Sequence, residues 1–262
     1  LNYRDKREFW RRVKQVHSRP NVLPSRMDDE TGNDAIAELF ARKYQALYQS
    51  VPTDANEMNE LLDCIESAVE ESSESVFMSP DDVQKAVAAL KRGKSDDQRL
   101  LYSDHLINGG DTLYMFLSLL FNCMLCHGHT PPQLLSSTFV SIPKNNKASM
   151  CDSSNYRSIA LCSSICKLLD MMIIAKCRDK LMTSDLQFGF KRCHSTVLCT
   201  ALYKETVQHF VNRGSTVYSV LLDASKAFDK VHYGTLFKLL IRRKLPPVII
   251  RLLLDSYTRQ TA

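Results

Sequence analysis

The sequence predicts a mixed α+β fold that is rich in helix, on three observations. Most of the 262 residues lie in segments whose apolar side chains recur at helical spacing, whereas only three short runs are typical of strands. Two of these runs are close enough to form a hairpin, and the third stands alone after two helices. With 44% hydrophobic and 24% charged residues, the composition is that of a globular protein and excludes wholesale disorder.

Three helices are expected in the N-terminal part of the chain. Phe9, Trp10, Val13 and Val16 have helical spacing within residues 4–17, and Asn33 is expected to cap a second helix that ends before Pro52. Residues 56–70 form the third. The polar stretch 70–75 then predicts a boundary between a helical N-terminal extension, residues 1–75, and a second domain, residues 76–262.

The second domain mixes helices with the three strand-like runs. Ser79-Pro80-Asp81-Asp82 is a typical helix start, with a capping serine, proline at the first position and acids in the first turn. Residues 138–142 and 156–161 are expected to pair as a hairpin with a long loop, and the apolar run 217–222 predicts a buried strand. The other expected helices cover residues 111–127, 163–181, 195–212, 233–243 and 247–259.

Charge is distributed unevenly along the chain. Residues 1–26 hold eight Lys/Arg against two acids, residues 27–82 hold two against fifteen, and residues 83–262 hold 24 against 12. The basic second domain favours a polyanionic partner if its charge gathers on one surface, while the acidic stretch is explained as a solvated helix face.

Nine cysteines, an odd number mostly within apolar segments, predict reduced thiols in an intracellular protein of the cytoplasm or nucleus. Cys123 and Cys126, with His127 and His129 after them, have ligand-like spacing, but their apolar helix favours buried core thiols over a zinc site. Neither a signal peptide nor a membrane span is visible, so no membrane partner is expected.

The residue with the most chemical interest is Asp223, directly after the expected buried strand. A buried carboxylate is costly unless it is paired, hydrogen-bonded or bound to a metal, and Mg²⁺ takes one or two carboxylates together with phosphate oxygens. The alternative is that Asp223 or Ser225 caps the following turn. Residue chemistry alone favours the cap, because aspartate is common at strand ends.

The local sequence adds a resemblance to a known family. Residues 222–231, Leu-Asp-Ala-Ser-Lys-Ala-Phe-Asp-Lys-Val, resemble motif A of the reverse transcriptases of LINE-type (non-LTR) retrotransposons. Four further blocks resemble the family in its own order: Ser103-Asp104-His105-Leu106-Ile107, Val140-Ser141-Ile142-Pro143-Lys144, Asn155-Tyr156-Arg157-Ser158-Ile159-Ala160-Leu161, and Asp185-Leu186-Gln187-Phe188-Gly189-Phe190 with His194-Ser195-Thr196. Five ordered blocks are far more specific than one motif.

The resemblance implies part of a right-hand polymerase, the fingers plus the first palm strand, over residues 76–262. It implies RNA-directed DNA synthesis from an RNA template, a DNA primer and dNTPs, by nucleotidyl transfer that uses two Mg²⁺ ions. The N-terminal helices resemble, less closely, the segment that joins an endonuclease to the polymerase, so an endonuclease upstream in the same polyprotein is a further expected partner.

The resemblance also implies roles for single residues. Asp223 would be a catalytic carboxylate that binds both Mg²⁺ ions, with the Ala224 carbonyl as a further ligand. Phe228 would be the steric gate that selects the deoxyribose sugar, the alternative being a core aromatic residue. Asp229 is interpreted as structural.

The implied substrate contacts lie on the hairpin and on one later block. Lys144 and Arg157 would contact the triphosphate of the incoming nucleotide. The alternative is that both are solvated strand residues. Gln187 and Gly189 would line the path of the template or nucleotide.

Two departures from the family stand out: Ser158 replaces the usual proline, and residues 96–99 replace a Gly/Pro-rich loop. The family's block of paired aspartates does not occur in the printed sequence, so this fragment is expected to be inactive alone. The alternative function is a non-catalytic relic or domesticated protein that binds nucleic acid.

Overall fold

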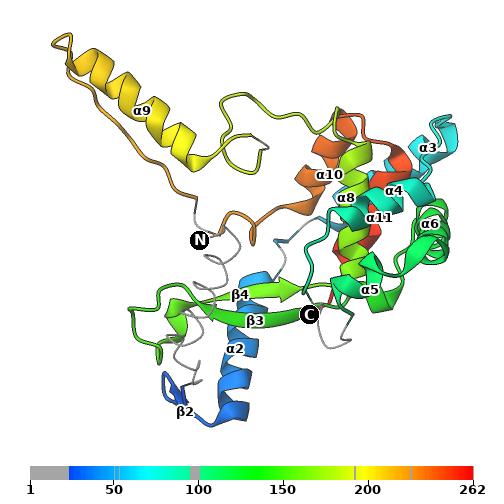
Figure 1. The fold of residues 1–262 in the computed structure, drawn as a ribbon, viewed down its shortest axis with the longest axis horizontal. Coiled ribbons are helices and arrows are strands. Elements are labelled where there is room, and N and C mark those ends of the chain that lie inside the picture. Colours follow the sequence, from blue (N-terminus) through cyan, green and yellow to red (C-terminus); the bar gives the residue numbers. More distant parts are fainter. Residues whose placement is uncertain are drawn as a thin grey trace, which may run out of the picture. The chain divides into compact units, whose positions relative to one another are not determined.

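The computed structural model describes residues 24–49, 51–52, 54–94, 101–191, 193–224 and 226–261. Helices dominate, accompanied in these residues by two two-stranded sheets, which confirms the helix-rich α+β class (Figure 1). The expected helix over 4–17 lies outside the described residues. The chain forms two compact units, one of residues up to 49 with 139–159 and one of residues 50–138 with 160–262. The domain boundary near residue 75 stays a prediction.

The first unit contains a small hairpin, one helix and most of a longer hairpin. Strands β1 (Arg26–Met27) and β2 (Glu30–Thr31) pair antiparallel and lead into α2 (Asn33–Tyr48). The expected cap at Asn33 is wrong: the helix begins at Asn33, and Gly32 holds the cap position with φ 89°. Glycine suits this place because the chain leaves β2 through a left-handed conformation that other residues adopt at a cost.

The predicted long-loop hairpin is confirmed, and aromatic rings hold α2 beside it (Figure 1). Strand β3 (Thr138–Pro143) pairs with β4 (Tyr156–Leu161), which follows the short 3₁₀ helix η1 (Ser153–Asn155). From α2, Tyr44 is buried, lies 5.8 Å from Phe139 between ring centroids and hydrogen-bonds Ser141 across 2.8 Å. The Tyr48 ring stacks on Phe139 at 4.7 Å. Aromatic pairs of this kind contribute about 0.5–1.5 kcal/mol each beyond their buried area.

The second unit is built from helices, and the predicted ones are found within a few residues of their expected bounds. The helices of this unit are α3 (Ala55–Glu71), α4 (Pro80–Ala88), α5 (Ser103–Ile107), α6 (Gly110–His127), α7 (Pro132–Leu135), α8 (Ser164–Lys176), α9 (Thr196–Val211), α10 (Tyr233–Arg242) and α11 (Pro247–Arg259), of which α5 and α7 had no predicted bounds. One hydrophobic core joins all of them except α9; Phe121, Leu168, Phe237 and Ile249 are fully buried in it. Among the described residues, no helix is long and apolar enough to cross a bilayer.

The expected start of α4 is confirmed in detail. Ser79 Oγ accepts from the Asp82 backbone N–H at 3.1 Å, and Asp82 Oδ2 accepts from the Ser79 N–H at 3.0 Å, which is a capping box. Lys176 of α8 lies 2.8 Å from the same carboxylate. Burial raises the pKa of Asp82, but the hydrogen bonds from Lys176 and Ser79 outweigh burial and hold this pKa below its usual value.

A half-buried arginine closes the C-terminus of α6. Arg251 of α11 donates to the carbonyls of Leu125 and Cys126 at 3.2 and 2.8 Å, and to Glu66 Oε2 of α3 at 3.1 Å. The helix ends at Gly128 in the left-handed conformation, φ 61°. The last carbonyls of a helix have no intrahelical partner, so this one guanidinium satisfies them and ties α3 and α11 to α6.

The predicted buried strand at 217–222 is wrong. This segment is extended but pairs with no strand in the described part of the chain. Tyr218, Val220, Leu221 and Leu222 are 83–95% exposed, Val217 is half-buried, and α9 before the segment has no buried residue. An apolar run becomes a central strand only when neighbouring strands pair with both edges and other elements cover both faces, and the described residues supply neither.

The prediction that Cys123 and Cys126 are core thiols is also wrong. Both are exposed, whereas Cys177 is fully buried. On α6 the stripe that packs consists of Leu117, Phe121 and Met124, spaced four and three residues apart, and the two cysteines lie off that stripe.

Candidate functional site

Lys144 and Arg157 lie on the β3–β4 hairpin of the first unit. Lys144 follows β3; its backbone N–H donates to the Asn155 carbonyl at 2.6 Å, and its Nζ donates to the Ser154 carbonyl at 2.9 Å. Arg157 is the second residue of β4 and is exposed, and its side chain makes no hydrogen bond or ion pair with any described residue. The hairpin therefore presents two exposed cations, of which the guanidinium is available for an anion.

The loop between these cations is fastened to α2 and to the β1–β2 turn. Lys43 Nζ of α2 donates to the carbonyl and the hydroxyl of Ser153 at 2.5 and 2.9 Å. Asp28 Oδ1 accepts from the Ser153 N–H at 3.0 Å, and the Asp28 N–H donates to the Cys151 carbonyl at 2.7 Å. Hydrogen bonds from Ser153 hold the pKa of Asp28 below its usual value. Sequence reasoning missed these contacts, because they join residues 110 to 125 positions apart.

The later blocks meet in the second unit. The exposed Phe228 ring, 75% accessible, lies edge-on to Phe190 with centroids 5.5 Å apart and planes at 82°. Gln187 Nε2 donates to the Gly189 carbonyl at 3.1 Å within the turn that carries Phe190. The structure thus brings together the turns that hold Gln187, Gly189 and Phe228, and the exposure of Phe228 rules out the core alternative.

Lys191 fixes the first of these turns and was not singled out from the sequence. Its Nζ donates to the carbonyls of Thr183 and Ser184 at 3.4 and 3.1 Å and to Asp185 Oδ1 at 2.9 Å. The hydrogen bond and the positive charge of Lys191 lower the pKa of Asp185. A lysine two residues after the glycine of a turn was the available signal.

Asp223 and Ala224 are both exposed, and Asp223 has no hydrogen bond or ion pair with the described residues. This corrects the expectation of a buried carboxylate at a strand end. The carboxylate and the Ala224 carbonyl are hard oxygen donors of the kind Mg²⁺ prefers. Two donors fall short of an octahedral shell, and no group of three or more His, Cys, Asp or Glu in the described ranges is arranged to hold a metal.

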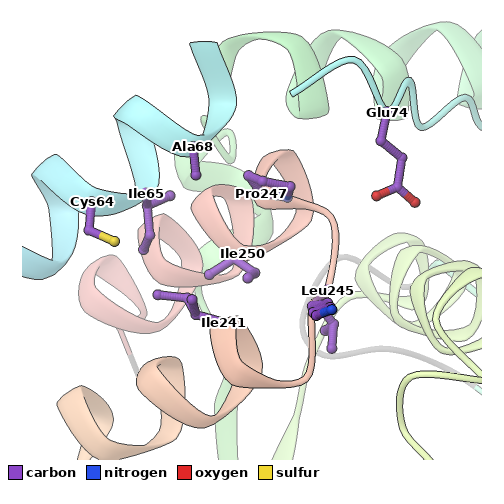
Figure 2. Close-up of a pocket in the computed structure, with 9 residues that line it drawn as sticks. Cys64, Ile65, Ala68, Glu74, Ile241, Leu245, Pro247 and Ile250 are labelled. Carbon is purple, nitrogen blue, oxygen red and sulfur yellow. The ribbon is translucent and has the colours of Figure 1, made fainter. Parts of the chain in front are cut away.

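A small apolar pocket of about 230 Å³ lies between α3, α10 and α11 in the second unit (Figure 2). Figure 2 shows Ile65 and Ala68 of α3, Ile241 of α10 and Ile250 of α11 around it. It contains none of the site residues predicted from the sequence, so we place no chemistry there.

Comparison with known proteins gives one family and two relatives. Residues 142–262 match the family model described as reverse transcriptase (RNA-dependent DNA polymerase). The chain is 33% identical over 150 residues, 55% of its length, to a probable RNA-directed DNA polymerase from transposon BS of Drosophila melanogaster. It is 25% identical over 127 residues, 48% of its length, to a retrovirus-related Pol polyprotein from type-1 retrotransposable element R2 of Nasonia vitripennis. The matches cover 16% and 12% of these two relatives.

Proposed function

We propose, from the premise that residues 142–262 are a reverse transcriptase segment of the non-LTR retrotransposon type, that this chain supplies the nucleotide-handling part of an RNA-directed DNA polymerase. One observation carries the proposal. The family match covers residues 142–262, and all seven site residues predicted from the sequence lie inside it. In this proposal the matched residues are the fingers and the start of the palm.

The hairpin cations bind the triphosphate of the incoming nucleotide. Arg157 is exposed and makes no ion pair with the described residues, so its fork of N–H donors is available for two phosphate oxygens at once. Lys144 adds a point charge and exchanges its contact with a neutral carbonyl for a stronger one with an anion. Neither cation forms a salt bridge with a described carboxylate, so triphosphate binding breaks no such ion pair. The free-energy cost of rearranging the site is therefore small.

Asp223 and the Ala224 carbonyl would supply two of the oxygen ligands of Mg²⁺ in this proposal. When bound, the metal would activate the primer hydroxyl and neutralise charge on the phosphates. Phe228 provides a rigid apolar face beneath the sugar and excludes a ribose 2′-hydroxyl, while Gln187 and Gly189 line the path beside it. The substrates are dNTPs, an RNA template and a DNA primer, and the excess of basic residues over 83–262 supports polyanion binding.

A non-catalytic nucleic-acid-binding protein is the second candidate. The observation that favours it is that no other acid joins Asp223 in a metal-binding group within the described residues. Such a protein binds RNA through its basic residues, with an affinity that falls steeply with salt, and has no preference for a nucleoside triphosphate.

We expect Arg157→Ala to weaken dNTP binding by the chain about tenfold, since a charge-assisted hydrogen bond contributes about 1.5–3 kcal/mol and this one is solvent-exposed. Titration of the chain with dTTP and Mg²⁺ measures this. Lys147→Ala is the matched control, because Lys147 is an exposed lysine on the same loop and carries the same charge. Equal losses in the two variants, or tight RNA binding without triphosphate binding, would favour the second candidate.

Phe228→Ala is expected to reduce discrimination against ribonucleotides by about a hundredfold, because the site loses the aromatic ring that excludes the 2′-hydroxyl. The measurement compares dNTP and rNTP incorporation by an active polymerase that contains this chain. Phe77→Ala is the control, since Phe77 is 62% exposed and lies outside the family match. Unchanged sugar selection in Phe228→Ala would contradict the gate.

A further inference from the structure

We infer that Asn155 is a positioning residue that sets the register of the hairpin bearing Lys144 and Arg157. This inference rests on the proposed function of these two cations. Asn155 ends η1 and directly precedes β4, so it lies where the long loop re-enters the sheet. It touches no substrate in this proposal and acts through the two cations on either side of the loop.

The side chain of Asn155 uses its acceptor and both its donor hydrogens on the loop. Its Oδ1 accepts from the Asn145 N–H at 3.1 Å. Its Nδ2 donates to the Asn145 carbonyl at 3.0 Å and to the Ser149 carbonyl at 3.1 Å. The residue is 8% exposed, so these polar atoms are largely shielded from water and losing a partner is costly.

The main chain of Asn155 holds the adjacent residue as well. Its carbonyl accepts from the Lys144 N–H at 2.6 Å, so Asn155 is hydrogen-bonded to both Lys144 and Asn145 at the end of β3. Successive side chains of a strand point to opposite faces, and a slip of one residue would turn Arg157 away from the face it now shares with its neighbours. The three side-chain hydrogen bonds of Asn155 form together in the observed register of the β3–β4 hairpin.

Residues outside the loop also hold this segment, whereas the Asn155 side chain makes its hydrogen bonds within the loop. Lys43 and Asp28 hold Ser153, and Asp152 Oδ1 accepts from the Ser154 N–H at 2.7 Å to start η1. These bonds fix residues 152–154 on α2 and the β1–β2 turn. The position of Lys144 and Asn145 relative to that anchor then depends on the Asn155 side chain.

A double-mutant cycle on triphosphate binding tests the inference. Asn155→Ala is expected to weaken dTTP binding by the chain about tenfold, but by less than about threefold when Arg157→Ala is already present, because residues that act through one another are not additive. Asn146→Ala is the matched control, since Asn146 is an exposed asparagine on the same loop, and it should leave binding unchanged. Binding is measured well below the thermal unfolding midpoint of each variant.

The outcomes separate the inference from the proposed function. Equal losses from Asn155→Ala in both backgrounds, or no loss, would assign Asn155 a purely structural role and overturn the inference alone. Absence of saturable dTTP binding by the unmodified chain would overturn the proposed function, and the inference with it. If Asn155→Ala does not fold, Asn155→Asp enters the same cycle, because it keeps the side-chain shape while placing a carboxylate against two carbonyls.

Discussion

Replacing Asp223 by alanine or asparagine is expected to abolish Mg²⁺-dependent DNA synthesis by an active polymerase that contains this chain. In the proposed function, its carboxylate is the metal ligand that the matched segment contributes. A bound metal supplies several kcal/mol of transition-state stabilisation, so the loss should reach about a thousandfold or more. The measurement is radiolabelled dNTP incorporation on an RNA template with a DNA primer.

The structure indicates that substitution of Asp223 removes the carboxylate without breaking a contact to another described residue. Asp223 is exposed and bonds to no described residue, so Asp223→Asn should leave the thermal unfolding midpoint of the chain unchanged. Asp229→Asn is the matched control, because it removes the same charge six residues later from a half-buried position interpreted as structural. Incorporation by Asp223→Asn at the unmodified rate would contradict the catalytic role, as would equal losses in the two variants.

Gly128→Ala is expected to lower the free energy of unfolding by about 3 kcal/mol. A Cβ at this position would lie 2.3 Å from Arg251 Nε and 2.7 Å from its Cδ, so the side chain that closes α6 must leave. Its charge-assisted hydrogen bonds contribute about 1.5–3 kcal/mol. The φ of 61° adds about 1 kcal/mol for any residue with a Cβ.

Urea unfolding of the chain measures this loss, and a second glycine separates its two causes. Gly93 has a similar φ of 67°, but no atom lies within 4 Å of a Cβ built there. Gly93→Ala should therefore cost only about 1 kcal/mol. In an Arg251→Ala background, Gly128→Ala should cost little more than Gly93→Ala. Equal costs for the two glycines in the unmodified chain would show that Arg251 does not close the helix.

Elements with local causes were predicted well from the sequence. The start of α4 at Ser79 and most helix bounds depend on residues within a few positions of one another. The strands of the β3–β4 hairpin are joined by a single loop, so they too are close in sequence. The Asn33 cap failed because the neighbouring Gly32 takes the cap position in the turn from β2. Periodicity also identified apolar stripes, but it did not tell which apolar residues face a partner, so Cys123 and Cys126 were placed in the core in error.

The candidate site was predicted as single residues rather than as an arrangement. The family blocks identified Lys144, Arg157, Asp223 and Phe228, and the structure shows their surroundings. Residues that hold the loops were missed: Asn155 was quoted only as part of a block, and Lys43 reaches Ser153 from another element. Contacts between residues far apart leave no periodic signal in one sequence.

The amino-acid sequence alone was sufficient for the helix-rich class, for most helix bounds and for the ordered blocks that resemble reverse transcriptases, because these depend on local chemistry and on ordered motifs. Tertiary structure decided the rest. The Phe190–Phe228 contact, the grip of Asn155 on the hairpin and the exposed course of residues 217–222 depend on which segments find partners in space. An apolar run encodes the capacity to be buried, and only packing against other elements turns that capacity into a buried strand.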